Sequence, residues 1–314
     1  MKLFIQVPCL NEEATLSLVL ESIPKKIKNI DSIEILIIDD GSSDKTIEVA
    51  KKYGVTHFVL HRRNMGLARS FRDGVDYALS HGADIVVNTD GDNQYPSNRI
   101  ADLVQPIISG EADIVIGDRQ THQIAYFSKF KKLMQRFGSF VVNRAAGTNV
   151  PDAASGFRAY SRKSLMMINV VTQFSYCMET IIQAGNKRLK LASIAIDTNP
   201  KTRESRLFKN IWHHMFKSGA AIVRSYLMFR PYVLFNFIGV VLLIAAAIPF
   251  INFGVHVLEG DTRGHIQSLI FGSAMLVGSL LSFALLGISD LLRINRILVE
   301  DQLERIKEIQ YGNK

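Results

Sequence analysis

The chain has 314 residues, of which 47% are hydrophobic and 21% charged, and its 37 Lys and Arg against 29 Asp and Glu give a net charge of +8. This composition excludes a disordered chain and a collagen-like repeat, and two cysteines are too few for a disulfide framework. The mean hydropathy of +0.13 is the first indication of segments that enter lipid.

The first two hundred residues predict alternating strands and helices. A strand pattern of apolar and β-branched residues, typical of a buried parallel sheet, occurs at residues 3–7, 33–38, 55–60, 85–88 and 114–116. Helices are expected between these runs: one after a cap at Asn11, one over residues 45–53 that Asp44 caps and Gly54 ends, and one that ends near Gly82. This alternation predicts an α/β doubly wound, mostly parallel sheet.

The positive charge is concentrated in two blocks. Residues 119–151 hold six Lys and Arg and no acid, and residues 201–230 hold seven and one acid, so each block has a net charge of +6 and the rest of the chain has −4. Such blocks bind nucleic acid, phosphate or a membrane surface. No nucleic-acid-binding motif is present. Anionic lipid and phosphate are therefore the expected partners.

Two segments near the other end are long enough to cross a bilayer. Residues 232–258 and 266–289 are 27 and 24 residues without Asp, Glu, Lys or Arg, and about 20 suffice to span. They predict a transmembrane hairpin; two helices buried in a soluble core are the alternative, against which the missing polar face argues. Lys and Arg flank the hairpin on both sides, whereas Arg263 is the one such residue of the loop at 259–265. Because basic residues favour the cytoplasmic side of a membrane, both termini are expected in the cytoplasm.

The expected organisation has four parts, which together make an integral protein of the cell (inner) membrane with two spans. They are an α/β cytoplasmic domain over 1–202, interfacial amphipathic helices over 203–230, two transmembrane helices over 231–290, and a cytoplasmic C-terminal helix over 291–314. The interfacial assignment depends on the apolar and basic residues that alternate along 203–230. An amphipathic helix packed on the domain is the alternative for that segment.

Acidic side chains follow two of the predicted strands. Asp39-Asp40-Gly41-Ser42 follows residues 33–38, and Asp90-Gly91-Asp92-Asn93-Gln94 follows residues 85–88. An isolated Asp-Gly pair usually marks a turn, but ligands of open α/β sheets bind beyond the carboxyl ends of the strands. Two acidic clusters at that edge therefore indicate a site. Asp90 and Asp92 are suited to bind Mg²⁺ or Mn²⁺, and the ion would keep coordination positions open for substrate phosphates.

Five ordered motifs resemble those of family 2 glycosyltransferases. They are Pro8-Cys9-Leu10-Asn11-Glu12, Asp39-Asp40-Gly41-Ser42, Asn64-Met65-Gly66, Asp90-Gly91-Asp92-Asn93-Gln94-Tyr95-Pro96 and Asp152-Ala153-Ala154-Ser155-Gly156-Phe157-Arg158. The branch is similar to dolichyl-phosphate mannosyltransferases and bactoprenol glucosyltransferases, over about residues 3–206. The resemblance implies a GT-A-like fold, and it implies hexose transfer from a nucleoside diphosphate sugar to polyprenyl (undecaprenyl or dolichyl) phosphate.

The resemblance also implies roles for residues on the donor side. The residues that would bind the nucleotide are Pro8, Asn11, Glu12, Asp39, Asp40, Asn64, Gly66 and Asp90. Among them Asp40 would contact the base or ribose, and Asp39 would support it. Asp90, Asp92 and Gln94 would hold the metal ion and the diphosphate. Arg69 stands where a small residue is expected.

On the acceptor side a lipid monophosphate needs no strong base, because its second pKa of about 6 leaves it largely anionic at neutral pH. By the resemblance, the residues that would bind this phosphate are Arg119, Arg136, Ser155 and Arg158. Asp152 matches the candidate base of the family and is interpreted as positioning the nucleophile. Glu179 would lie near the sugar. The implied catalytic residues are Asp92, Arg119, Asp152 and Arg158.

The favoured reaction is an inverting, metal-dependent transfer from UDP-glucose, and GDP-mannose is the alternative donor. A processive polysaccharide synthase of the same family is disfavoured because the chain has two spans and lacks a Gln-x-x-Arg-Trp motif around Trp212, its one tryptophan. A catalytically inactive membrane scaffold is the non-enzyme alternative, against which the complete acidic set argues. Homo-oligomer formation is left open.

Overall fold

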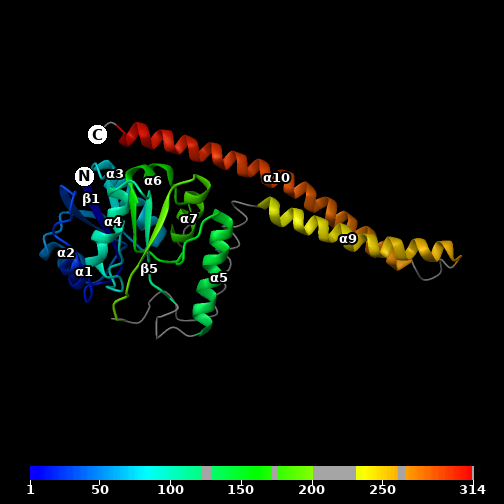
Figure 1. The fold of residues 1–314 in the computed structure, drawn as a ribbon, viewed down its shortest axis with the longest axis horizontal. Coiled ribbons are helices and arrows are strands. Elements are labelled where there is room, and N and C mark those ends of the chain that lie inside the picture. Colours follow the sequence, from blue (N-terminus) through cyan, green and yellow to red (C-terminus); the bar gives the residue numbers. More distant parts are fainter. Residues whose placement is uncertain (122–128, 172–175, 201–230, 261–265, 313–314) are drawn as a thin grey trace. The chain divides into compact units, whose positions relative to one another are not determined.

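The computed structural model describes residues 1–121, 129–171, 176–200, 231–260 and 266–312 (Figure 1). The chain divides into two compact units, Met1–Val223 with Glu300–Lys314, and Arg224–Val299. The interfacial helices expected over residues 203–230 lie outside the described residues.

Seven described strands of the first unit form one sheet, in the order β3-β2-β1-β4-β6-β5-β7. Their bounds are β1 (Lys2–Cys9), β2 (Ser32–Asp39), β3 (His57–Leu60), β4 (Ile85–Asn88), β5 (Ile114–Asp118), β6 (Arg158–Ser161) and β7 (Leu191–Ala195). Strand β6 runs antiparallel to both of its neighbours, and the other pairs are parallel. The mostly parallel α/β sheet is confirmed, and β6 and β7 are additions to the expected strands.

The helices of this unit are α1 (Leu16–Ser22), α2 (Thr46–Lys52), α3 (Leu67–Ser80), α4 (Ile100–Ile108) after the short η1 (Ser97–Arg99), α5 (Lys129–Ala146), α6 (Arg162–Met167) and α7 (Tyr176–Asn186). Asp44 Oδ1 accepts a hydrogen bond from the first amide of α2 (3.0 Å), and Gly54 and Gly82 follow α2 and α3 with positive φ, as expected. The expected cap at Asn11 is wrong, because α1 begins after Thr15.

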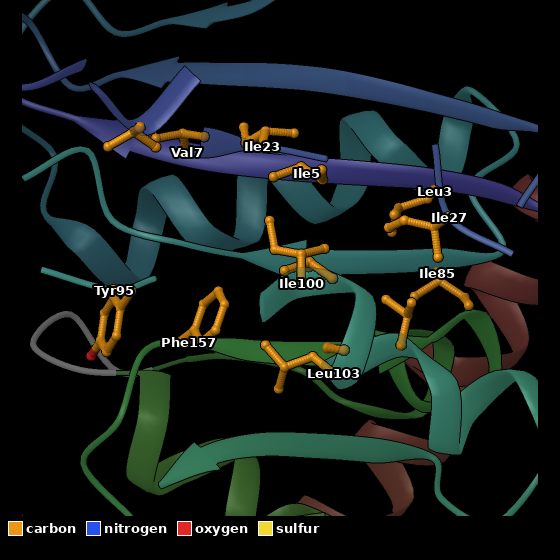
Figure 2. Packing of buried hydrophobic residues seen from close by; sticks show 14 of the residues in the cluster. Leu3, Ile5, Val7, Ile23, Ile27, Ile85, Tyr95, Ile100, Leu103 and Phe157 are labelled. Atoms are coloured by element: carbon orange, nitrogen blue, oxygen red, sulfur yellow. The ribbon is translucent and has the colours of Figure 1, made fainter. Parts of the chain in front are cut away.

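Apolar side chains fill the space between the sheet and its helices on both faces. On β1, Leu3, Ile5 and Val7 belong to a buried cluster that includes Ile100 and other residues of α1 and α4 (Figure 2). The alternate residue, Phe4, faces the other side, where its ring contacts Tyr77 of α3. Helices therefore cover both faces of the sheet, which explains why its central strands are continuous apolar runs.

The second unit contains the long apolar helix α9 (Pro231–Leu258) and the first part, up to Val299, of α10 (Ile266–Tyr311). Both helices are long and apolar enough to cross a membrane. They pack as a hairpin: Ser279 and Ser282 each donate a hydrogen bond to a backbone carbonyl of α9, at 2.8 Å. Large apolar residues such as Phe237 and Leu280 are exposed, as lipid-facing residues are. The second span and the C-terminal helix, which were expected as two elements, form one helix.

The last turns of α10 belong to the first unit and contact α6 and α7. Lys307 Nζ donates to the carbonyls of Leu165 and Ile168 (3.1 and 2.7 Å) at the end of α6. Glu304 pairs with Lys187 at 3.1 Å, just after α7. These bonds make the C-terminal residues part of the α/β unit.

Candidate active site at the carboxyl edge of the sheet

The acidic motifs meet at one edge because the strands that precede them are neighbours. Strand β1 lies between β2 and β4, with Cys9 beside Asp39 and Gln6 beside Asn88. The loop after β1 contacts the loop after β4, since Thr15 Oγ1 donates to the carbonyl of Gly91 at 2.8 Å. These parallel strands bring the expected nucleotide and metal residues together.

The loop after β1 is bound to the loop after β2. Asn11 has a left-handed φ of 55°, and its Oδ1 accepts a hydrogen bond from the amide of Ser43 at 2.7 Å. The amide of Glu12 donates to Thr46 Oγ1 at 2.8 Å, and its carboxylate accepts from Thr15 Oγ1 at 3.0 Å. Pro8 is buried within β1. The residues after β1 that were expected to bind the nucleotide therefore also stabilise the loop after β2.

Asp40 organises the loop that precedes α3. Its carboxylate accepts from the amides of Met65 and Gly66, at 2.8 and 2.9 Å, and from His61 Nδ1 at 2.8 Å. The loop passes so close to Gly41 that a Cβ there would lie 2.8 Å from the carbonyl carbon of Arg63, and the φ of Gly41 is +83°. Both features require glycine. Gly66 lies in this loop, as does Asn64, which is exposed.

Asp39 differs from Asp40 in its partners. Its Oδ2 accepts from the amide of Ser42 at 3.1 Å, and its buried Oδ1 has no hydrogen-bond partner within the described part of the chain. The supporting role implied for Asp39 therefore fits Asp40 better, and Asp39 keeps an oxygen for another donor.

The loop after β4 places Asp90 and Asp92 on either side of Gly91. Gln94 supports this loop, because its amide and its Nε2 both donate to the carboxylate of Asp92, at 3.1 and 2.9 Å. Negative charge accumulates here. Burial, and then the charges of Glu12, Asp39 and Asp90, raise the pKa of the Cys9 thiol well above its ordinary value.

Two carboxylates are a suitable protein ligand set for Mg²⁺ or Mn²⁺, which bind through one or two carboxylates together with water and substrate phosphates. Asp90 and Asp92 fit this requirement. Over the described residues, no group of three or more His, Cys, Asp or Glu forms a closed metal cage. Gln94 Nε2 donates to Asp92, so Gln94 orients the carboxylate of Asp92.

Arg119 and Asp152 form a bidentate ion pair beside the acidic loop. Arg119 follows β5, and its Nε and Nη2 donate to the two oxygens of Asp152 at 2.6 and 2.9 Å. Burial acts to raise the pKa of the Asp152 carboxyl, but the hydrogen bonds and charge of Arg119 outweigh it and hold that pKa below its ordinary value. Asp152 is therefore an ionised, paired carboxylate.

Tyr95 and Gly156 join the acidic loop to the segment that follows Asp152. Tyr95 Oη accepts from the amide of Gly156 at 2.9 Å, and a Cβ on Gly156 would lie 3.6 Å from Asp90 Oδ2. Burial raises the pKa of Tyr95, Arg119 opposes that rise, and the charges of Asp90 and Asp152 add to it. One tyrosine thus lies within electrostatic reach of both the expected metal site and the expected acceptor site.

Arg158 has an environment different from the one expected of a phosphate ligand. Its side chain is fully buried on β6, and it donates to the carbonyls of Ala153, Ser155 and Cys177 and to Thr180 Oγ1, at 2.7 to 2.9 Å. Its guanidinium therefore holds backbone in place. Ser155 is also fully buried, and its Oγ lacks a hydrogen-bond partner within the described residues.

Arg136 and Glu179 lie on two different helices of the α/β unit. Arg136 is exposed on α5. Glu179 is 1% exposed on α7, where it accepts from the amide of Val171 (3.1 Å) and from Gln183 Nε2 (3.3 Å).

Several residues that hold the loops of the site in place could not be predicted from the sequence, because their partners are remote in the chain. Asn88 Nδ2 and Tyr176 Oη both donate to the carbonyl of Gly156 at 3.1 Å. Asn199 donates from its side chain to the carbonyl of Asn93 at 2.9 Å and from its amide to the carbonyl of Gln94 at 3.0 Å. Tyr95 alone carries a signal, because it stands in the acidic motif.

Known proteins resemble the chain in sequence and in fold. The family model described as glycosyl transferase family 2 matches residues 4–168. An uncharacterized protein of Methanocaldococcus jannaschii is 32% identical over 205 residues, which cover 63% of this chain and 81% of that protein. The UDP-N-acetylglucosamine--dolichyl-phosphate N-acetylglucosaminyltransferase of Methanococcus voltae is 26% identical over 219 residues, which cover 62% and 85%.

The polyprenol monophosphomannose synthase of Mycolicibacterium smegmatis is 25% identical over 182 residues, which cover 55% of this chain and 67% of that protein. Among solved structures, the glucosyl-3-phosphoglycerate synthase of Mycobacterium tuberculosis in complex with Mn²⁺, UDP-glucose and phosphoglyceric acid matches with a TM-score of 0.56 at 20% identity. That match covers 72% of this chain and 78% of the synthase, and it shows that the folds are alike.

Proposed function

Because the chain belongs to glycosyltransferase family 2, we propose that it transfers a hexose from a nucleoside diphosphate sugar to a polyprenyl phosphate at the cytoplasmic face of the membrane. One observation carries this proposal: Tyr95 of the acidic motif is hydrogen-bonded to Gly156, four residues along the chain from Asp152, which pairs with Arg119. A site with carboxylates at one end and a guanidinium at the other suits a metal-bound diphosphate donor and an anionic acceptor.

On the donor side, the residues around Asp39 and Asp40 are assigned to the nucleotide. Asp39 Oδ1 is the acceptor for an N–H or O–H of the base or ribose, and Asp40 keeps the loop with Asn64 and Gly66 in place. Asp90 and Asp92 would hold Mg²⁺ or Mn²⁺. When bound, the ion would neutralise the charge that develops on the leaving diphosphate.

On the acceptor side, Arg119 would bind the lipid phosphate, and Asp152 orients Arg119 through two hydrogen bonds. An acceptor oxygen forms a bond to the sugar C1 while the bond from C1 to the diphosphate oxygen breaks, so the configuration at C1 inverts. No proton has to be removed, because the phosphate is already anionic. Arg158 acts through the backbone of Ala153 and Ser155 as a positioning residue. Glu179 is proposed to contact the sugar and Arg136 the acceptor phosphate.

Helix α5 supports contact with a lipid surface. Leu133, Phe137 and Phe140 are 62%, 54% and 64% exposed, and their spacing along the sequence places them on one side of the helix. Arg136 and Arg144 are exposed on the same helix. Apolar side chains flanked by arginines match the interface of a membrane that contains anionic lipids.

The donor is proposed to be UDP-glucose, with GDP-mannose as the second candidate. The M. voltae relative is named for a UDP-sugar and the M. smegmatis relative for a mannose product, so the relatives support both. No described residue distinguishes uracil from guanine.

A transfer assay with the full-length protein tests the proposal. Detergent-solubilised protein is incubated with Mn²⁺ or Mg²⁺, undecaprenyl phosphate and labelled UDP-glucose, UDP-N-acetylglucosamine or GDP-mannose. Label from one donor is expected in the lipid extract. Absence of lipid-bound label with all three donors would contradict the proposal.

Asp92→Asn tests the metal assignment in the same assay. The substitution removes the charge of one proposed ligand, so transfer should fall by about 100-fold or more. Asp102→Asn is the matched control: Asp102 lies on α4 and pairs with Arg99, and the substitution should leave transfer unchanged. Both variants should unfold at the wild-type temperature. Full activity of Asp92→Asn would remove the metal assignment.

A further inference from the structure

His61 lies between two carboxylates, and neither the sequence motifs nor the relatives assign it a role. It follows β3, and its side chain is 9% exposed. Its Nδ1 lies 2.8 Å from Asp40 Oδ1, and its Nε2 lies 3.1 Å from Asp73 Oδ2. Asp73 belongs to α3, so the imidazole connects that helix to the carboxyl end of β2.

These two contacts make His61 a bridge between the carboxylates. Each ring nitrogen lies within hydrogen-bonding distance of one carboxylate, so a single side chain holds Asp40 and Asp73 together. Asp73 also has cationic neighbours: Arg69 Nε lies 2.7 Å from Oδ2, and Arg72 Nε lies 3.8 Å from Oδ1. Side-chain contacts therefore run in one chain through Asp40, His61, Asp73 and Arg69. This arrangement also gives Arg69 a contact within the domain.

This chain of contacts ends at Asp40, which holds the loop assigned to the nucleotide. Asp40 accepts from the amides of Met65 and Gly66 with the same carboxylate that His61 contacts. Without His61, Asp40 would lose a hydrogen-bond partner and its side-chain connection to Asp73 of α3. The loop and the adjacent Asp39 would then be less well ordered for a ligand.

We propose that His61 is a positioning residue for the donor nucleotide: through the contacts of its two ring nitrogens it joins α3 to Asp40 and so fixes the loop over residues 62–66. This inference rests on the proposed function, because it assumes that this loop binds the nucleotide. It assigns no role to His61 in binding the acceptor or in the transfer step.

Calorimetric titration of the detergent-solubilised, full-length protein with UDP and with GDP, in Mn²⁺, tests the inference. His61→Ala should weaken binding of the preferred nucleotide about tenfold, the usual size of a lost hydrogen bond to a charged group. His61→Gln keeps one hydrogen bond and should weaken binding about threefold. The donor KM should rise in parallel, whereas kcat and the KM for undecaprenyl phosphate should not change.

His57→Ala is the matched control. His57 belongs to the same strand and also bonds α3, through Tyr77 Oη at 3.0 Å, but it contacts Glu34 and lies at the opposite end of β3. It should leave nucleotide binding unchanged. A double-variant cycle adds Asp73→Asn, whose effect should vanish in the His61→Ala background because the two residues act through one chain of contacts.

The outcomes separate this inference from the function on which it rests. If the wild-type protein binds neither UDP nor GDP, both are overturned. If the wild type binds a nucleotide and His61→Gln binds it equally well, the positioning role alone is overturned. The same holds if His61→Ala and His57→Ala weaken nucleotide and acceptor binding to the same extent, because that result would indicate a general loss of stability.

Discussion

Asp152 is the site residue whose charge is most strongly constrained. Arg119 donates two hydrogen bonds to it, and the pKa of Asp152 lies below its ordinary value although burial opposes this. A lowered pKa means that the folded protein binds the proton less tightly than the unfolded chain does. The stability that Asp152 contributes is therefore complete above about pH 4 and is lost as the pH falls through the pKa of the folded state.

We expect Asp152→Asn to lower the free energy of unfolding by about 3 kcal/mol at pH 7, because Arg119 would be left without its partner. Since the variant has no carboxyl to titrate at this position, its stability should also fall less steeply below pH 4. Denaturant unfolding measured between pH 3 and pH 7 checks both effects. An unchanged acid slope would show that Asp152 is not held ionised by Arg119.

Strand β6 is the element whose role the structure changes most. It carries Arg158, for which the family resemblance implied a phosphate contact, and it turns that side chain into the domain, where backbone carbonyls accept its hydrogen bonds. The segment held in this way contains Asp152. Arg158 can therefore affect the acceptor site without touching the acceptor.

We expect Arg158→Met to lower the stability of the α/β unit by about 3 kcal/mol or more, because several buried carbonyls would lose their donor. Protein that still folds should show a smaller rise in the KM for undecaprenyl phosphate than Arg119→Met does, because Arg158 acts on the acceptor site only through the backbone. Thermal unfolding and steady-state kinetics on the two variants distinguish these roles. A rise in acceptor KM as large as that of Arg119→Met, with normal stability, in Arg158→Met would restore the phosphate contact.

The strands that the sequence predicted are those with a local pattern. The strands β1, β2 and β4 are apolar runs between two helical layers, and a run of that kind is visible without knowledge of any partner. Strand β6 reads Arg-Ala-Tyr-Ser and β7 reads Leu-Ala-Ser-Ile-Ala, so neither offers a continuous apolar run. Their pairing with β4 and β5 depends on contacts that are remote in the sequence.

The same limit separates the predicted from the unpredicted parts of the site. The acidic motifs are local, and parallel strands bring them to one edge, so Asp39, Asp40, Asp90 and Asp92 could be grouped from the sequence. The different roles of Asp39 and Asp40 could not be predicted from the sequence, because they depend on which of the two carboxylates contacts the loop before α3. The burial of Arg158 likewise depends on α7, from which Cys177 and Thr180 accept its hydrogen bonds.

At the scale of the whole molecule, the proposed orientation predicts which segments face each side of the membrane. Cys9 and Cys177 are buried, so a cysteine introduced elsewhere can be labelled selectively. We expect a membrane-impermeant maleimide to label Thr262→Cys in intact cells, and Asn313→Cys only after permeabilisation, because basic residues flank the hairpin on the C-terminal side. The reverse pattern would place the α/β unit outside the cell.

The central claim is that this protein joins a hexose to a polyprenyl phosphate, and the chemical identity of the lipid product tests it most directly. Wild-type protein is incubated with Mn²⁺, undecaprenyl phosphate and the donor that labels the lipid extract, and the product is analysed by tandem mass spectrometry. The account predicts a polyprenyl monophosphate that carries one hexose, and a fragment in which the hexose remains on the phosphate. A lipid diphosphate, a sugar polymer or an unmodified acceptor would contradict it.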